Sequence, residues 1–174
     1  MLSPKLETER LILRRYEESD IDAFYEIIHD DRLQNFIKFP DLTVEEELGY
    51  IKECVKNVET DKLERWAIVL KENNETIGNI SVNTVVKKHN YCDVGYVIRY
   101  DYWGYGYAAE ALEAISNYLL DSGYYLVECT CNERNIQSSK VMEKAGFNRD
   151  GLIPNRRMNK DGTYSGVVYY SKTK

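Results

Sequence analysis

The sequence predicts an α/β fold of the α+β type, with a mixed, mainly antiparallel central sheet of about seven strands and helices on both faces. Three observations support this expectation. The 174 residues suffice for one sizeable core, and no linker rich in Pro, Gly or Ser divides them. The middle of the chain is a series of β-prone runs, and segments with helical periodicity lie on either side of it. We therefore expect residues 1–174 to form a single domain.

The N-terminal third predicts one strand and two helices. Apolar and charged residues alternate over Leu6–Tyr16, as in a half-buried strand. A helix over Ser19–Asp30 is expected next, with Ser19 as its N-cap, Asp22 at the capping-box position and an apolar stripe formed by Ile21, Phe24, Ile27 and Ile28. A second helix is expected over Thr43–Val58, with Glu46 completing a capping box and an apolar stripe formed by Leu48, Ile51 and Val55.

Three runs rich in Val, Ile, Thr and Tyr predict an antiparallel meander in the middle of the chain. They span Trp66–Leu70, Thr76–Val86 and Cys92–Arg99. The dipeptides Asn73-Asn74 and His89-Asn90 separate them, and asparagine is typical of tight turns between strands.

The C-terminal part alternates helices and strands. The first helix covers Gly106–Leu120, with a buried stripe of Ala108, Ala111, Leu112, Ile115 and Leu119. The second ends at Gly146, a residue suited to a left-handed helix stop. In full, the expected elements after the first helix are a strand over Tyr124–Cys131, a helix over Ile136–Ala145, and strands over Phe147–Ile153 and Tyr164–Ser171.

Composition narrows the class of partner. The formal net charge is −6, whereas nucleic-acid binders usually carry a basic face. The spacing of Cys54, Cys92, Cys129 and Cys131 matches no zinc pattern, and we expect reduced thiols and no metal. No apolar stretch approaches the roughly 20 residues that span a bilayer, and the N-terminus does not resemble a signal peptide. A cytoplasmic protein without a nucleic-acid or membrane partner is expected.

A glycine-rich turn lies between the meander and the following helix, over Tyr96–Leu112. The first N–H groups of a helix lack internal partners and sit at the positive end of its dipole, so such a turn suits phosphate. A Walker loop is excluded because Tyr107 and Ala108 follow Gly106 where Lys and Ser or Thr are needed. A dinucleotide fingerprint fits poorly because the flanking strands look antiparallel. A tight turn without a ligand is the other interpretation.

The segment Asn132–Phe147 is the second informative region. Asn135 suits a helix N-cap, Ser138 falls three residues later, and Gly146 ends the helix. On its own, this segment is explained by ordinary helix chemistry.

In their order and spacing, the motifs resemble the GNAT superfamily of N-acetyltransferases, and within it the ribosomal-protein N-terminal (RimJ/RimL-like) branch. The resemblance covers nearly the whole chain. Besides the two segments above, it rests on Leu6–Arg14, Gly78-Asn79-Ile80 and Val94-Gly95-Tyr96. It implies a GNAT-like fold and transfer of an acetyl group from acetyl-coenzyme A to a primary amine.

The resemblance also implies roles for individual residues. The backbone of the turn would cradle the coenzyme A pyrophosphate, through Trp103, Gly104, Tyr105, Gly106, Tyr107 and Ala108. The strand end Tyr96, Val97 and Ile98 would pair with the pantetheine arm, and an N–H of Val97 or Ile98 would bind the thioester carbonyl. Asn135 would touch the coenzyme near its pantetheine end, and Ser138 would lie near the sulfur. This chain departs from relatives at Tyr105, where Lys or Arg is frequent, and at Gly166, where the branch often has Asp near the acceptor site.

The expected chemistry is direct attack of a neutral amine on the thioester. Backbone N–H groups suit the oxyanion, and a hydroxyl can protonate the leaving thiolate. Ser138 is the first choice for that proton and Asn135 completes the catalytic pair, with a tyrosine as the alternative donor. The sequence does not identify a base. It leaves open the acceptor (a protein N-terminus, amino acid, polyamine or aminoglycoside-like amine) and a monomeric or homodimeric state. A non-catalytic coenzyme A-binding module and a nucleotide-binding oxidoreductase are the alternative functions.

Overall fold

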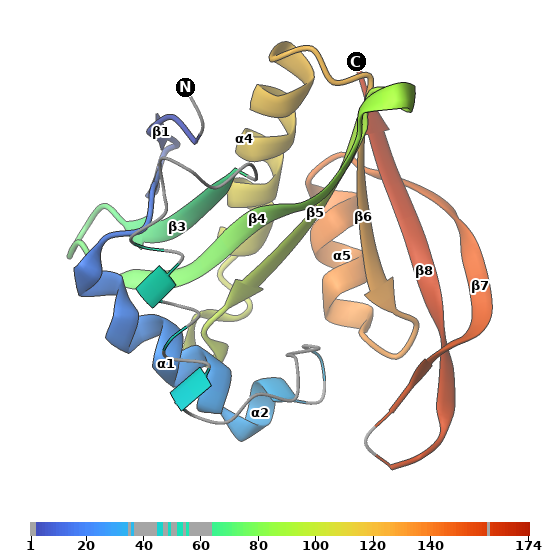
Figure 1. The fold of residues 1–174 in the computed structure, drawn as a ribbon, viewed down its shortest axis with the longest axis horizontal. Helices are drawn as coiled ribbons and strands as arrows, with labels where there is room; N and C mark the ends of the chain where they lie inside the picture. Colours follow the sequence, from blue (N-terminus) through green and yellow to red (C-terminus); the bar gives the residue numbers. More distant parts are fainter. Residues whose placement is uncertain are drawn as a thin grey trace. The chain divides into compact units, whose positions relative to one another are not determined.

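The computed structural model describes residues 3–34, 36, 45–46, 49, 52–53, 55, 64–159 and 161–174. Its strands form one eight-stranded sheet in the order β1-β2-β3-β4-β5-β6-β8-β7 (Figure 1). The strands are β1 (Leu6–Glu7), β2 (Leu11–Arg14), β3 (Arg65–Leu70), β4 (Thr76–Val86), β5 (Tyr91–Ile98), β6 (Leu126–Asn132), β7 (Asn148–Met158) and β8 (Tyr164–Thr173). Strands β5 and β6 pair in parallel, and β1–β2, β2–β3, β3–β4, β6–β8 and β7–β8 pair antiparallel. The expectation that the strands flanking the glycine turn are antiparallel was wrong, because β5 and β6 are those strands. The predicted fold class is confirmed, with eight strands instead of about seven.

The additional strand comes from the N-terminal segment, where the prediction of one strand over Leu6–Tyr16 was wrong. Strands β1 and β2 form a hairpin in which Leu6 pairs with Leu13. The Thr8 N–H donates to the Leu11 carbonyl and the Leu11 N–H to Thr8 Oγ1, both at 3.0 Å. A threonine side chain thus helps to close the loop.

The start of the first helix also differs from the prediction. Ser19 is not the N-cap, because a 3-10 helix over Glu18–Asp20 leads into α1 (Ile21–His29). The capping carboxylate belongs to Asp20 and not to Asp22, since Asp20 accepts the Glu17 N–H at 2.7 Å. Asp20 is 1 % exposed. The Arg14 guanidinium donates to both of its oxygens, at 2.8 and 3.1 Å, and Thr76 adds a further hydrogen bond. These bonds compensate the burial of a charge.

Contacts between Cα atoms divide the chain into two compact units, Met1–Ser81 with Tyr96–Tyr107 and Val82–Gly95 with Ala108–Lys174. The single-domain assignment stays a prediction. The second helix expected over Thr43–Val58 lies outside the described residues, apart from isolated positions within it.

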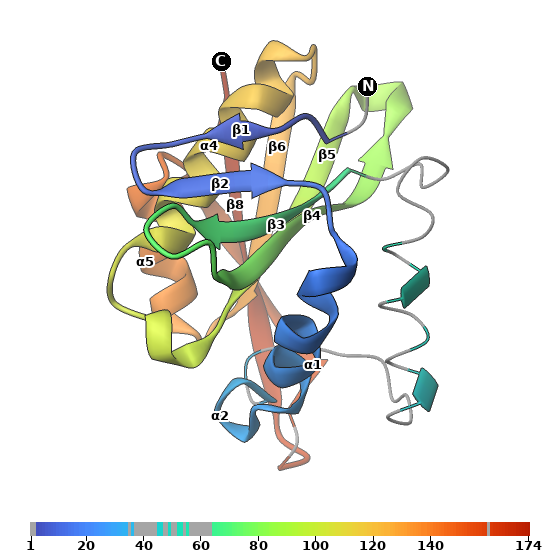
Figure 2. The same ribbon diagram turned by 90° about the vertical axis from the view of Figure 1, so that its left-hand side faces the viewer.

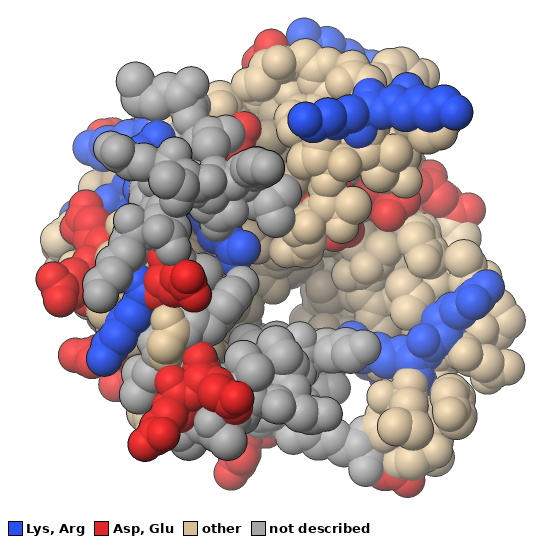
Figure 3. Space-filling view, in the orientation of Figure 1, with Lys and Arg blue, Asp and Glu red and all other residues tan. Residues whose placement is uncertain are grey.

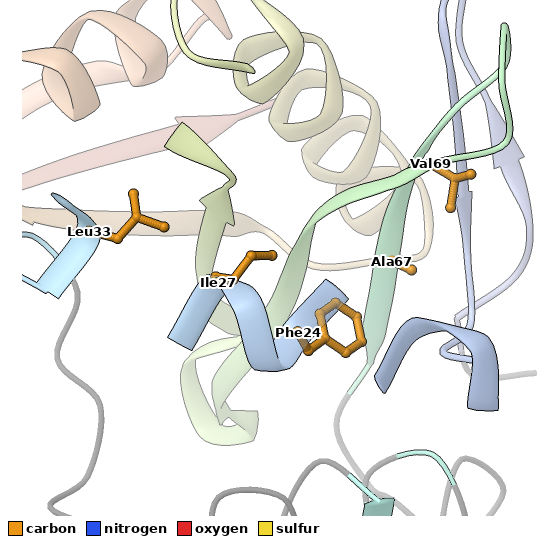
Figure 4. Packing of buried hydrophobic residues seen from close by; sticks show 5 residues of the cluster. All are labelled: Phe24, Ile27, Leu33, Ala67 and Val69. Carbon is orange, nitrogen blue, oxygen red and sulfur yellow. The ribbon is translucent and has the colours of Figure 1, made fainter. Parts of the chain in front are cut away.

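The first unit is built on β1–β3, α1 and the short helix α2 (Asp31–Gln34) (Figure 2). Its core joins both helices to β3, through Phe24, Ile27, Leu33, Ala67 and Val69 (Figure 4). The expected stripe of α1 is confirmed, because Ile21 and Ile28 pack against this cluster. All residues from Trp66 to Leu70 are buried, so both faces of β3 are covered.

The second unit holds most of α4 (Tyr107–Asp121) and all of α5 (Ile136–Lys144), with α5 beside β6 (Figure 1). Ala109, and not Ala108 as predicted, is the buried alanine in the first turn of α4. The Lys172 ammonium on β8 donates to Ser116 Oγ at 3.3 Å and to the Ala145 carbonyl at 2.9 Å, which connects both helices to one strand. Gly146 has a φ of 84°, which confirms the predicted left-handed stop.

The remaining turns follow the sequence signals. Asn74 and Asn90 have φ angles of 59° and 53°, so the two asparagines expected between the meander strands adopt left-handed conformations. On the face drawn in Figure 3, acidic and basic side chains lie interspersed. Among the described residues, no helix is long and apolar enough to cross a membrane.

Candidate functional site

The predicted phosphate-binding turn has the backbone that its glycines suggest. Gly104 and Gly106 have φ angles of 84° and 85°, a region that side chains rarely adopt. A Cβ added to Gly104 would meet nothing within 4 Å, so the conformation, and not crowding, explains this glycine. The turn runs directly into α4, whose first N–H groups have no partner within the helix.

The end of β5 before the turn lies outside the β5–β6 pairing. The parallel pairing of β5 with β6 joins Tyr91–Asp93 to Leu126–Glu128 and covers three residues of each strand. On the other side, the Arg99 N–H donates to the Ile77 carbonyl of β4 at 2.8 Å. The predicted pantetheine-binding residues Tyr96–Ile98 therefore lie beyond the β5–β6 register.

Gly78 on β4 permits a close approach of the two strands at this point. A Cβ at this position would collide with the Val97 carbonyl oxygen and come within 3.1 Å of the Ile98 Cα. No side chain fits there without movement of β5.

Trp103 anchors the turn in the first unit. Its indole Nε1 donates to the Ile98 carbonyl at 2.9 Å, and its ring packs against the core cluster. The ring centroids of Tyr100 and Phe36 lie 5.0 and 5.6 Å away. Trp103 is thus an apolar anchor with one satisfied polar atom.

Ion pairs hold the segment between β5 and the turn. Glu75 accepts from Arg99 at 2.6 Å and from the Tyr102 hydroxyl at 2.7 Å. The hydrogen bond to the Glu75 carboxylate, with some burial, raises the pKa of Tyr102 to about 12. Arg32 reaches Asp101 at 2.8 Å, but both side chains are about half exposed or more (49 % and 61 %), and such a pair contributes about 0–1 kcal/mol. The hydrogen bonds of Glu75 therefore stabilise this segment more than the Arg32–Asp101 pair does.

Arg10 contacts the glycine turn, and the sequence did not predict this contact. It lies in the β1–β2 loop, and its Nη1 donates to the Tyr105 carbonyl at 3.0 Å. Its guanidinium carbon is 4.5 Å from the centroid of the Tyr107 ring, a cation–π distance. Ninety-five residues separate the bonded pair, so no local pattern could reveal it.

The other predicted site residues belong to the second unit. Asn135 is the N-cap of α5, as expected, and its Oδ1 accepts the Ser138 N–H at 3.0 Å. Ser138 is half-buried in the first turn of the helix. The capping role of Asn135 is confirmed, whereas the roles of both residues toward the coenzyme stay predictions. The neighbouring Cys131 thiol lies 3.5 Å from Ser139 Oγ, and burial raises the pKa of that thiol.

Packing explains the glycine at position 166. The Gly166 N–H donates to the Glu133 carboxylate at 2.5 Å. A Cβ would lie 2.5 Å from Leu152 Cδ1 and 3.0 Å from the Ile153 carbonyl. A side chain here would have to displace the exposed Leu152 and crowd the Ile153 carbonyl, and Glu133 Oε2 lies 3.2 Å from the same position.

The described residues contain no group of three or more His, Cys, Asp or Glu side chains placed to hold a metal ion.

Comparisons with known proteins identify the class. A family model described as an acetyltransferase (GNAT) domain matches residues 10–148, which is more than half of the chain. The uncharacterized N-acetyltransferase YnaD of Bacillus subtilis (strain 168) is 31 % identical over 147 residues, covering 84 % of each chain. This chain therefore belongs to the GNAT acetyltransferases, as its motifs suggested.

Two solved structures share the fold. An acetyltransferase of the GNAT family from Bacillus anthracis is 25 % identical with a TM-score of 0.83, and 98 % of each chain is covered. RimL, the ribosomal L7/L12 alpha-N-protein acetyltransferase, was solved in complex with coenzyme A. It is 19 % identical with a TM-score of 0.84, again over 98 % of each chain. The resemblance to the RimJ/RimL-like branch is confirmed at the level of the fold.

Proposed function

We propose that this protein transfers an acetyl group from acetyl-coenzyme A to a primary amine. The observation that carries the proposal is the turn at Gly104 and Gly106, whose two left-handed residues lead into the N-terminus of a 15-residue helix. Backbone N–H groups at such a terminus suit a pyrophosphate, and the family model and the coenzyme A complex of RimL support the same ligand. The backbone of Trp103–Ala108 binds the pyrophosphate, and no metal is required.

The backbone directions favour Ile98 over Val97 as the donor to the thioester carbonyl. Along a strand, successive N–H groups point to opposite sides. The Arg99 N–H points to β4, where it binds the Ile77 carbonyl. The Val97 N–H then points to β4 as well, and the N–H groups of Tyr96 and Ile98 point away from it, toward the pantetheine arm.

The reaction forms a C–N bond and breaks the C–S bond. A neutral amine attacks the thioester carbon, and the Ile98 N–H stabilises the oxyanion. The attacking nitrogen gives its extra proton to water, the thiolate leaves with a proton from the hydroxyl of Ser138 or a tyrosine, and solvent returns a proton to that hydroxyl. Asn135 holds the first turn of α5 through the Ser138 N–H, and so supports the Ser138 side chain. The acceptor is a protein N-terminal α-amine or a small-molecule amine. An α-amine, with a reference pKa near 8, needs less help from a base than a lysine amine near 10.4.

The proposal places the enzyme in the cytoplasm, as a monomer or a homodimer.

The first experiment is a thermal-shift titration with acetyl-coenzyme A, coenzyme A, NAD and ATP. A ligand at 100 times its dissociation constant adds about 2.7 kcal/mol to the stability of the native state. We expect a shift with the coenzyme A species alone. A shift with NAD alone would instead favour an oxidoreductase, and no shift with either coenzyme A species would refute the proposal.

Gly106→Asp tests the turn, because it places a side chain and a negative charge against the pyrophosphate. Gly162→Asp is the matched control. Gly162 also has a positive φ (77°) and open surroundings, but it lies in the β7–β8 hairpin. We expect Gly106→Asp to abolish coenzyme binding and Gly162→Asp to leave it intact. Equal affinities of the two variants would remove the glycine turn from the mechanism.

Catalysis is tested separately, by amine-dependent release of the coenzyme thiol over a panel of N-terminal peptides, polyamines and amino acids. Release at background for every amine, in a protein that binds acetyl-coenzyme A, would indicate a non-catalytic coenzyme A-binding module. Ser138→Ala is expected to lower turnover more than affinity for acetyl-coenzyme A. A normal rate would assign the proton to a tyrosine or to solvent.

A further inference from the structure

Arg10 makes a contact with the glycine turn that the proposed function does not yet use. Its backbone is fixed, because the Lys71 N–H donates to the Arg10 carbonyl at 2.9 Å and the Thr8–Leu11 bonds close the loop around it. The side chain extends from this fixed point to the Tyr105 carbonyl. The cation–π contact with Tyr107 restricts the guanidinium further.

The acceptor of this hydrogen bond belongs to the peptide unit that joins Tyr105 to Gly106. A peptide unit is planar and trans, so its C=O and N–H point in opposite directions. The bond from Arg10 to the Tyr105 carbonyl therefore directs the Gly106 N–H to the opposite side of the peptide. Gly106 has no side chain to restrict this rotation, and its φ of 85° lies where glycine is conformationally free.

A charged donor on a carbonyl also polarises the peptide. Hydrogen bonds in a chain strengthen one another, so the Gly106 N–H becomes a better donor when the Tyr105 carbonyl accepts from a guanidinium. An anion on the far side of this peptide gains from both effects.

We propose that Arg10 is a positioning residue for the coenzyme, which holds the Tyr105–Gly106 peptide with its N–H directed at the pyrophosphate. The inference rests on the proposed function. It explains why an arginine from the N-terminal hairpin reaches this turn.

The test compares coenzyme A binding by Arg10→Ala, Arg10→Lys and Lys5→Ala, measured by isothermal titration calorimetry. Lys5 is the control, because it is a cation directly before β1 of the same hairpin and pairs with Glu7 at 2.8 Å. We expect Arg10→Ala to weaken coenzyme A binding about tenfold. Lys5→Ala is expected to bind within about twofold of the wild type. Arg10→Lys, whose ammonium can still donate to the carbonyl, should recover most of the loss.

Two readouts separate positioning from a general loss of structure. With a saturating amine, the KM for acetyl-coenzyme A should rise while kcat stays within about twofold. In ¹⁵N-glycine-labelled protein without ligand, the Gly106 amide proton should move upfield in Arg10→Ala, because it loses the polarising donor, while the Gly151 signal stays in place.

Two results would overturn the role of Arg10. One is an Arg10→Ala variant that binds coenzyme A as tightly as the wild type, and the other is an equal loss in Lys5→Ala. A wild type that gives no binding heat with coenzyme A would instead refute the proposed function itself.

Discussion

Gly78→Ala is the sharpest test of how β4 and β5 meet next to the predicted pantetheine-binding residues Tyr96–Ile98. The added Cβ would collide with the Val97 carbonyl oxygen and lie 3.1 Å from the Ile98 Cα and 3.0 Å from Ile98 Cδ1. Two of these three atoms are backbone, so relief requires displacement of β5. Overpacking costs about 1–3 kcal/mol, and we expect a value near 3 here because a strand must move. For a chain of this size, that loss lowers Tm by roughly 6–12 °C.

Gly151→Ala and Gly95→Ala are controls for Gly78→Ala, and the free energy of unfolding in urea is measured for all three variants. Gly151 has open surroundings, so Gly151→Ala should stay within about 0.5 kcal/mol of the wild type. A Cβ at Gly95 would meet the Asn83 side-chain amide at 2.6 Å, and that amide can move at the loss of its bond to Asp93, about 1 kcal/mol. The displaced Val97–Ile98 segment should also weaken acetyl-coenzyme A binding in Gly78→Ala. Equal stability of Gly78→Ala and Gly151→Ala would refute the close approach of the strands.

Three further substitutions test other parts of the structure. Asp20→Asn should lower the free energy of unfolding in urea by about 3 kcal/mol, because it leaves Arg14 without its buried partner. The control Asp22→Asn changes an exposed carboxylate and should alter this free energy by less than about 0.5 kcal/mol. Similar values for the two variants would contradict a stabilising role of the Arg14–Asp20 pair. Tyr102→Phe tests the raised pKa of Tyr102. The pKa of Tyr102 is higher in the folded than in the unfolded state, so the hydroxyl stabilises the native state below the unfolded pKa near 10. The difference in free energy of unfolding between the wild type and Tyr102→Phe should therefore be full below pH 10 and disappear by about pH 12. A difference that stays constant in chemical unfolding from pH 8 to 12 would rule this out. Gly166→Asp should destabilise by about 1–3 kcal/mol through crowding and repulsion from Glu133, and Glu133→Gln in the same chain should recover part of the loss; an unchanged melting temperature would show that this site has room for a side chain.

Features set by neighbours in sequence were predictable. The helix α5 is an example, since its cap at Asn135 and its stop at Gly146 lie within one short segment. The left-handed turns at Asn74 and Asn90 are others. In each case, one residue type satisfies a backbone requirement a few positions away, and a single sequence contains all the information needed.

Features set by distant residues were not predictable. The Asp20 carboxylate caps the 3-10 helix that precedes α1, by accepting the Glu17 N–H, and Arg14 on β2 and Thr76 on β4 surround it, whereas local spacing favoured Ser19 and Asp22. The strand expected over Leu6–Tyr16 is a hairpin because the Thr8 hydroxyl helps to close a short loop between two strands. Glycine at position 166 depends on crowding by Leu152 and Glu133, which are distant in sequence.

The conformation of the glycine turn depends both on residues within the turn and on residues distant in sequence. The residues of the turn itself, Gly104 and Gly106, allow the backbone conformation but do not select it, since glycine is free to adopt many others. Selection comes from outside the turn, from the Trp103 bond to Ile98, from Glu75 on Arg99 and Tyr102, and from Arg10 on Tyr105. A turn held in this way has already lost the entropy that a flexible glycine loop would lose on binding, so more of the interaction with a phosphate appears as affinity. The conformation of the glycine turn therefore depends on contacts from several elements of the first unit, although the motif itself occupies only a few positions.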